Sequence, residues 1–509
     1  MPNVRAELKQ SIEALGRNVP PLLFVSSNKI KNDLFEKTHS KKPFVLVDNT
    51  DEIFFKEATV KQHVERNFGR PINYPSRMAE GKALATAMSL KGEIEGSFTV
   101  VTADSVLLVP RADGKGYDPL NRDGDVSDEA MIDRIVTAGE VVYSGAVAAA
   151  DERGGVYSVQ TYVKFPIGQR PSKLPYSFEE LEEMYQASDQ DAQVEVGFLK
   201  PWATSEGIKF DFEPVNNKRY DRSSDAFDFL SGVEEESLKV VEKAVEFDRK
   251  VAPTLQEVIT THPFNTYKYV LPDVNLNDPE KHLIDGIGLM QGGDCTFMTD
   301  RVYHKLKELH QQGIEYRVAT FDTQRYPVSE GHVGFVITDS DNTFGLVDGG
   351  MTISHPVIYS KARSLQPLSY AGGKKQAMII EDRRGNHSLV QVKNNGNDKM
   401  TAVRLARGRD YTTRVDYLKL LTRIQPETVR ARNTELTFEI FDGDGIKTAS
   451  FVTSRDGNTR VKVRADTLYD GPLTIEDEAL SSSLALFGVT SSEVMGAYNN
   501  WIRITKPQT

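Results

Sequence analysis

The stretch Gln291-Gly292-Gly293-Asp294-Cys295 decides the fold of the C-terminal half, and it contains the only cysteine among 509 residues. After it, apolar residues recur at three- and four-residue spacing at Met298, Val302, Leu306 and Leu309. This spacing predicts an amphipathic helix that begins near Cys295. The thiol would then lie in the first turn, where the helix dipole favours the thiolate over the thiol.

Two short apolar runs follow this helix, Gly331–Ile337 and Phe344–Asp348, and the polar segment Thr338–Thr343 separates them. The pattern predicts a β-hairpin, because a turn-rich segment joins two strand-like runs. His332 begins the first strand and Asp348 ends the second, so antiparallel pairing would bring them to the same end. A thiol at a helix start with His and Asp on adjoining strands predicts a Cys-His-Asp nucleophile system.

A lone cysteine also has a simpler interpretation, because buried cysteines commonly serve as small apolar packing residues. A Gly-Gly pair before a helix can likewise be only a tight turn. The order of the three groups favours the catalytic interpretation. The nucleophile Cys295 comes first, a strand-borne His332 follows, and Asp348 then ends an apolar strand before Gly349-Gly350.

Residues 235 to 500 resemble the arylamine N-acetyltransferase family within the transglutaminase-like thiol superfamily. The matching motifs are the Gly-Gly-x-Cys of residues 292–295, His332, the Val-Asp-x-Gly of residues 347–350 and the upstream Pro-Phe pair of residues 263–264. Gln291 replaces the family's Arg, and residues 296–299 lack its Glu-x-Asn. The resemblance implies acyl transfer from acetyl-CoA or another thioester, through an acyl-cysteine, to an amine or hydroxyl acceptor. We expect His262, next to this Pro-Phe pair, to have a structural role.

The N-terminal part has successive strand-like runs that end in polar loops with helices between them, which indicates an α/β domain. The first loop contains four polar groups that suit phosphate binding at a helix start. They are Ser27, Asn28, Lys29 and Lys31. Lysines alone are more commonly solvated surface charges.

Roughly residues 20 to 170 resemble the superfamily of Maf and inosine triphosphate pyrophosphatases. The resemblance is carried by the loop at residues 26–31, Gly81-Lys82-Ala83 and the strand end Val101–Val106. It implies hydrolysis of a nucleoside triphosphate between its α- and β-phosphates. Lys82 would join the lysines of the loop as a phosphate clamp, and Asp104 with Glu52 would hold a Mg²⁺ ion.

Together these patterns predict a multidomain protein of α/β and α+β class. We expect a pyrophosphatase-like domain at residues 1–170, a linker region at 171–232 and an acetyltransferase-like domain at 233–509. The last would hold helices at 233–251 and 255–260, a β-barrel or strongly twisted sheet, and two closing helices within 475–502.

Three alternative functions stay open. The thiol could hydrolyse or transfer amides instead of thioesters. The nucleotide domain could be the active enzyme, with the thiol domain as its regulatory partner. Both domains could instead be binding modules.

The bulk composition is that of an ordinary soluble protein, with 39% hydrophobic and 27% charged residues. No run of about 18 apolar residues and no apolar signal core are present, so we expect a cytoplasmic protein without a membrane span. The net charge of −11 argues against a nucleic-acid partner. One cysteine excludes an intramolecular disulfide framework.

Overall fold

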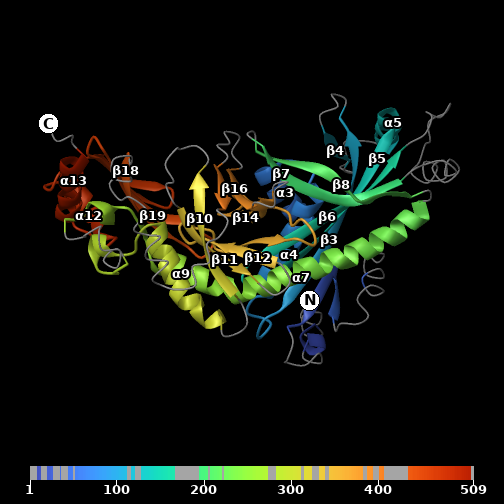
Figure 1. Ribbon diagram of the computed structural model, residues 1–509, viewed down its shortest axis with the longest axis horizontal. Helices are drawn as coiled ribbons and strands as arrows, with labels where there is room; N and C mark the ends of the chain where they lie inside the picture. Colours follow the sequence, from blue (N-terminus) through green and yellow to red (C-terminus); the bar gives the residue numbers. More distant parts are fainter. Residues whose placement is uncertain are drawn as a thin grey trace. The chain divides into compact units, whose positions relative to one another are not determined.

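The computed structural model divides into two compact units (Figure 1). Unit 1 comprises Met1–Arg249 and Ser360–Leu368, and unit 2 comprises Lys250–Tyr359 and Ser369–Thr509. The structure describes residues 8–12, 20–26, 35, 44–49, 52–111, 116–120, 128–166, 194–204, 207–220, 223–272, 283–310, 315–323, 332–338, 343–381, 387–393, 401–405 and 434–505.

Unit 1 is built on a mixed sheet with the order β2-β1-β3-β5-β6-β7-β8, and β4 pairs with β3. β1 pairs in parallel with both β2 and β3, and all five of its residues are buried, as is usual for a parallel strand covered on both faces. The remaining pairs of this sheet are antiparallel. Its strands are β1 (Leu22–Ser26), β2 (Phe44–Asp48), β3 (Thr99–Pro110), β4 (Tyr117–Leu120), β5 (Glu140–Asp151), β6 (Val156–Pro166), β7 (Val194–Thr204) and β8 (Gly207–Tyr220).

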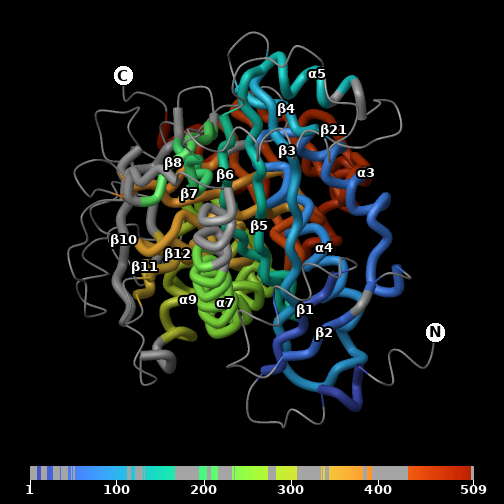
Figure 2. Tube along the Cα trace, turned by 90° about the vertical axis from the view of Figure 1, so that its right-hand side faces the viewer, coloured from blue at the N-terminus to red at the C-terminus, as the bar shows by residue number. Residues whose placement is uncertain are grey.

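Helix α4 (Tyr74–Leu90) packs along β3, β5 and β6, where Figure 2 shows it beside the sheet. Its sequence permits close packing, because Ala79, Ala83 and Ala87 all lie fully buried against the sheet side. Gly81 faces helix α3 (Glu57–Phe68), and a methyl group at this position would lie 2.7 Å from Val60 Cγ1. Helix α5 (Asp128–Ala138) also belongs to unit 1. The α/β class predicted for this part is therefore observed, as a mixed sheet with helices.

Unit 1 extends well beyond residue 170. Residues 194–204 and 207–220, which were predicted to belong to a linker region, form β7 and β8 of the sheet. Residues 360–368 also belong to unit 1. There the Gln366 N–H donates to Ser158 O at 2.9 Å, and its side-chain amide donates to Leu199 O at 3.0 Å.

Helix α7 (Ser223–Thr261) is continuous through the boundary between the units, which falls at Arg249. The prediction of two separate helices here is wrong, because Pro253 lies inside the helix without ending it. Buried apolar residues flank the proline on both sides, with Val251 and Leu255 fully covered. Their burial stabilises the helix across the missing backbone N–H of proline.

Unit 2 contains two sheets and several helices. Their orders are β13-β12-β11-β10-β17-β16-β15-β14 and β21-β20-β19-β18-β9, so no pairing among the described strands closes the predicted barrel. The strands are β9 (Phe264–Asn265), β10 (Glu315–Thr323), β11 (His332–Thr338), β12 (Thr343–Val347), β13 (Val357–Ser360), β14 (Leu368–Tyr370), β15 (Lys375–Glu381), β16 (His387–Lys393), β17 (Thr401–Leu405), β18 (Glu435–Phe441), β19 (Lys447–Ser454), β20 (Asn458–Val463) and β21 (Asp466–Pro472). The helices are η1 (Tyr267–Val270), η2 (Gly288–Met290), α9 (Cys295–His310), α12 (Glu478–Ala485) and α13 (Ser491–Thr505).

The two closing helices predicted near the C-terminus are confirmed as α12 and α13. They share one apolar core with the five-stranded sheet, in which Phe438 and Phe451 stack 4.8 Å apart. Trp501 of α13 is fully buried in this core. Within the described parts of the chain, no helix is both long and apolar enough to cross a membrane.

Candidate active site

The turn before Cys295 requires two glycines for two different steric reasons. Gly292 has φ +59°, and a methyl group there would lie 1.9 Å from the carbonyl oxygen of Pro263. At Gly293 the added methyl would lie 2.4 Å from Phe297 Cβ. The Gly293 N–H donates to the same Pro263 carbonyl at 3.1 Å. The motif therefore has a physical cause: Pro263 lies so close to Gly292, and Phe297 so close to Gly293, that only glycine fits at either position.

Asn265, which lies in the same segment as Pro263, holds this turn in place through hydrogen bonds. Its side-chain amide donates to Leu289 O and to Gln291 O, both at 2.8 Å, and its backbone N–H donates to Gly293 O at 2.9 Å. Its side-chain Oδ1 accepts the N–H of Tyr267 at 2.8 Å. Asn265 is fully buried, so each of these bonds forms in a site shielded from water.

Helix α9 begins at Cys295, as the apolar spacing predicts. Asp294 caps it, because its Oδ1 accepts the N–H of Thr296 at 3.0 Å and of Phe297 at 3.2 Å. The thiol thus has the helix dipole on one side and the acidic cap on the other. The dipole and the carboxylate act in opposite directions on a negative charge at this end of the helix.

One face of α9 turns toward the predicted hairpin. Cys295 and Met298 lie three residues apart, so they share a face of the helix. A methyl group at Gly349 would lie 3.3 Å from Met298 Cβ and 3.7 Å from Val302 Cγ2. The face that contains the thiol therefore packs at the end of β12, beside Asp348.

The hairpin itself is confirmed, because β11 and β12 pair antiparallel with Phe335 opposite Val347. β11 begins at His332 and β12 ends at Val347, so His332 and Asp348 lie at the same end of the hairpin. The structure describes the backbone of His332 but not its side chain. The catalytic pairing of the three groups stays a prediction.

Asp348 is buried, with only 1% of its surface exposed, and it accepts the N–H of Met351 at 3.0 Å. Its negative charge acts on the phenol of Tyr370 in β14. Burial, together with the nearby Asp348 carboxylate, raises the pKa of the Tyr370 phenol well above its usual value. The Tyr370 hydroxyl accepts a hydrogen bond from Gln391 Nε2 at 2.6 Å. Tyr370 is thus a neighbour of the candidate site that sequence patterns did not reveal.

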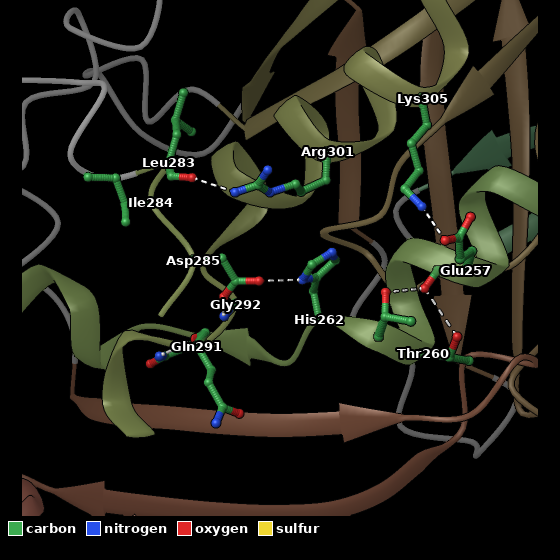
Figure 3. Close-up of polar contacts among 12 residues, drawn as sticks. Glu257, Thr260, His262, Leu283, Ile284, Asp285, Gln291, Gly292, Arg301 and Lys305 are labelled. Carbon is green, nitrogen blue, oxygen red and sulfur yellow. Dashed lines mark hydrogen bonds and ion pairs between the residues drawn. The ribbon is translucent and has the colours of Figure 1, made fainter. Parts of the chain in front are cut away.

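The other face of α9 carries a charged cluster around the ring of Phe297. Lys268 Nζ lies 4.4 Å and the Arg301 guanidinium 4.8 Å from the ring centroid, and the His262 ring meets it edge-on at 5.4 Å. Burial lowers the pKa of Lys268 to about 8, although Asp285 and Asp294 act in the opposite direction. Figure 3 shows Arg301 reaching Leu283 and His262 reaching Asp285. We name this group, formed by Phe297, Lys268, Arg301, His262 and Asp285, the Phe297 cluster.

The phosphate-binding candidates of unit 1 are only partly observed. Lys82 is buried, and its Nζ donates to Glu57 Oε1 at 2.7 Å and to Asp104 Oδ1 at 3.2 Å. Burial acts against the ammonium, but Asp104 and Glu57 outweigh it and raise the pKa of Lys82. The other candidates lie outside the described residues: Ser27, Asn28, Lys29 and Lys31.

The predicted Mg²⁺ ligands do not fit a shared metal site. Asp104 contacts the Lys82 ammonium, which would repel a dication. Glu52 has φ +51°, and its Oε1 accepts the N–H of Glu57 at 3.2 Å. Within the described residues, no three His, Cys, Asp or Glu side chains form a group that could hold a metal ion.

Comparison with known proteins gave structural matches only. No protein-family model matches the chain, and no curated protein matches it by sequence. An arylamine N-acetyltransferase of Mycobacterium smegmatis is similar at 14% identity and a TM-score of 0.35, over 51% of this chain and 91% of that protein. The arylamine N-acetyltransferase of M. tuberculosis is similar at 16% identity and a TM-score of 0.33, over 50% of this chain and 92% of that protein.

A second kind of structure also matches. A HAM1 protein of Coxiella burnetii is 12% identical with a TM-score of 0.21, over 43% of this chain and 100% of that protein. Because all of these scores are low, the candidate site depends on the residues of this chain alone.

Sequence reasoning missed most of the residues that hold the cysteine turn. Asn265 and Asp285 both bond to it, yet they lie 30 and 10 positions before Cys295, outside any helical or strand periodicity. The available signal for Asn265 was its place directly after the Pro-Phe pair. Asp285 had no comparable signal.

Proposed function

We propose that unit 2 is a thiol-dependent acyltransferase with Cys295 as its nucleophile. One observation carries the proposal: the face of α9 that begins at Cys295 packs, through Met298, against Gly349 at the hairpin end where Asp348 is buried. The beginning of β11 places His332 at that same end. A nucleophile, a base and an orienting carboxylate are the three roles that such a site needs.

In the first half-reaction His332 takes the proton of the Cys295 thiol, and Asp348 stabilises the resulting imidazolium. The thiolate sulfur attacks the thioester carbonyl and forms a new carbon–sulfur bond. When the tetrahedral intermediate collapses, the carbon–sulfur bond to the donor breaks and the donor leaves as a thiol with the proton from His332. An acyl-Cys295 remains.

In the second half-reaction an amine or hydroxyl acceptor attacks the acyl carbon while His332 takes its proton. The bond between the acyl carbon and Cys295 breaks, and the proton returns to the thiol. The products are an amide or ester and the free enzyme. Donor and acceptor are small molecules in this scheme, with acetyl-CoA as the first donor to test.

The proposal is tested by following free thiol release from acetyl-CoA in the presence of an arylamine. We expect thiol release with wild type, loss of at least about a thousandfold with Cys295→Ser, and a strong loss with Asp348→Asn. Cleavage of a peptide amide, without release of thiol from acetyl-CoA, would instead assign amide hydrolysis to the same cysteine. A Cys295→Ser variant with unchanged thiol release would refute the role of Cys295.

For unit 1 we propose, as a second candidate function, binding and hydrolysis of a nucleoside triphosphate. The supporting observation is Lys82, a buried ammonium whose pKa is raised, so it stays charged and can attract phosphate. Glu57 and Asp104 both accept hydrogen bonds from its Nζ. An incoming phosphate would compete with these carboxylates for the same N–H donors.

Release of pyrophosphate from nucleoside triphosphates, measured with and without added Mg²⁺, tests this second candidate. Lys82→Ala should abolish release, and the Lys200→Ala variant, which removes an exposed lysine of the same unit, should not. If wild type releases no pyrophosphate from any common nucleoside triphosphate, the hydrolytic assignment fails.

A further inference from the structure

We propose that His262 and Asp285 form a positioning pair that fixes the Gly292–Gly293 turn, and with it Cys295, from the side of α9 opposite the thiol. The expected effect of this pair on turnover rests on the proposed acyltransferase function. Its effect on the position of the thiol is independent of that function, because thiol reactivity can be measured without any acyl donor.

Asp285 uses both of its carboxylate oxygens in this arrangement. Oδ1 accepts the N–H of Gly292 at 2.8 Å, and Oδ2 lies 2.9 Å from His262 Nδ1 (Figure 3). His262 Nδ1 and Asp285 Oδ2 are thus in close polar contact. Asp285 therefore links the histidine to the turn that precedes the nucleophile.

His262 is joined to the same turn a second time through the backbone. Its own N–H donates to Val258 O at 3.1 Å at the end of α7. The next residue, Pro263, accepts the Gly293 N–H and approaches Gly292 so closely that a methyl group would not fit. A shift of His262 would thus move both the carbonyl and the carboxylate that define the turn.

The contact that His262 makes with α9 separates it from the proposed catalytic base. It meets the ring of Phe297 edge-on, and Phe297 lies two residues after Cys295. Residues two apart on a helix point to different faces. Cys295 shares its face with Met298, which packs at the hairpin end instead. His262 is for this reason a positioning residue and not a group that takes the thiol proton.

The charges around His262 come from three elements. They are Asp285 on the loop before α9, Arg301 and Lys305 on α9, and Glu257 on α7, which pairs with Lys305. Burial lowers the pKa of His262, the two cations add to this effect, and Asp285 opposes it. The imidazole is accordingly neutral at neutral pH. Its protonation in acid would draw the Asp285 carboxylate toward the ring and away from the Gly292 N–H.

The first test is the rate at which iodoacetamide alkylates the folded protein. Cys295 is the only cysteine, so the rate reports on this thiol alone. Asp285→Ala removes both contacts and should slow alkylation about tenfold, because a hydrogen bond to a charged group is lost. Asp285→Asn retains an oxygen acceptor for Gly292 and should stay within about threefold of wild type. Alkylation of folded Asp285→Ala at the wild-type rate would overturn the proposal.

A matched control is available on the same helix. His304 Nε2 lies 3.4 Å from Asp300 Oδ1, so the two residues form a second histidine–aspartate pair, with Asp300 five and His304 nine positions after Cys295 on α9. We expect His304→Asn to leave both the alkylation rate and acyl transfer unchanged. If it slows alkylation as much as Asp285→Ala does, the effect of Asp285→Ala is general destabilisation and the proposal is wrong.

The second test is the pH profile of alkylation, which does not require the Asp285→Ala variant to fold. In wild type the alkylation rate should fall in acid more steeply than in the His262→Asn variant, because only wild type has an imidazole beside Asp285 that takes up a proton. Profiles of the same shape for both proteins would overturn the proposal. In acyl transfer, His262→Asn should lower kcat and leave KM for the donor unchanged. If wild type transfers no acyl group yet the alkylation results hold, only the proposed function fails.

Discussion

The cysteine turn of unit 2 and the Lys82 group of unit 1 illustrate two ways in which a motif relates to structure. In the turn, Gly292 and Gly293 are required by direct steric contact with Pro263 and Phe297. In unit 1, Lys82 is held by ion pairs with Glu57 and Asp104. The first motif specifies one backbone conformation, whereas the second specifies only a charge that several partners can satisfy. A steric motif is therefore the stronger predictor of a site.

The largest expected effect tests the steric requirement of the turn. Gly292→Ala places a methyl group 1.9 Å from the Pro263 carbonyl at a positive φ, so the backbone must move. We expect a loss of about 3 kcal/mol or more in the free energy of unfolding, together with slow alkylation of Cys295. Urea unfolding followed by circular dichroism measures this loss.

The control for this variant is Gly496→Ala in α13, where the added methyl meets nothing within 4 Å. Alanine is favoured over glycine in a helix by about 1 kcal/mol, so this change should be neutral or stabilising. If the two variants have equal stability, the turn is not sterically constrained and the contrast between the two regions disappears.

The second effect tests the charged group of unit 1. Lys82→Met leaves Asp104 and Glu57 without their shared cation, and we expect about 1 to 2 kcal/mol of destabilisation. Lys200→Met removes a lysine of similar length from an exposed pair with Glu213 and should cost less than about 0.5 kcal/mol. Urea titration compares the two variants, and equal effects would contradict a buried role for Lys82. Alkylation of Cys295 should be unaffected by either change.

A third effect concerns Lys268 of the Phe297 cluster and its dependence on pH. The folded protein holds the pKa of Lys268 at about 8, against 10.5 for the ordinary side chain. Between these two values the unfolded chain binds more protons than the folded one, so the free energy of unfolding should rise from pH 8 to about 10.5. In the Lys268→Met variant, this part of the rise in the free energy of unfolding should be absent. Parallel stability curves for both proteins would show that Lys268 is not buried as described.

The smallest expected effect concerns the acidic cap of α9. Asp294→Asn retains a side-chain oxygen for the first amides of the helix but removes the negative charge beside Cys295. The helix dipole then acts unopposed, and we expect alkylation at neutral pH to become about two- to fivefold faster. Slower alkylation would mean that the cap matters for geometry more than for charge.

Sequence patterns predicted the elements whose signals are local. The helix after Cys295 and the hairpin of β11 and β12 follow from spacing within about fifteen residues, and both are present. The closing helices α12 and α13 follow from the same kind of signal.

What the sequence did not predict depends on contacts between distant residues. The bond from Asn265 to Gln291 spans 26 positions, and the bond from Gln366 to Leu199 spans 167. Neither leaves a periodic pattern. β7 and β8 were not predicted because their sequences contain prolines and charges, and the pairing of distant strands overrides that local composition. The arrangement of strands into open sheets instead of a barrel is likewise decided by distant pairing.

The most direct test of the central claim is the intact mass of the protein after brief incubation with acetyl-CoA, followed by peptide mapping. We predict a gain equal to one acetyl group, located on Cys295 and lost when an arylamine acceptor is added. Cys295→Ala, measured in parallel, should show no gain. A gain of the same size in the Cys295→Ala variant, or an acetyl group mapped to another residue, would contradict the assignment of Cys295 as the acyl-carrying nucleophile.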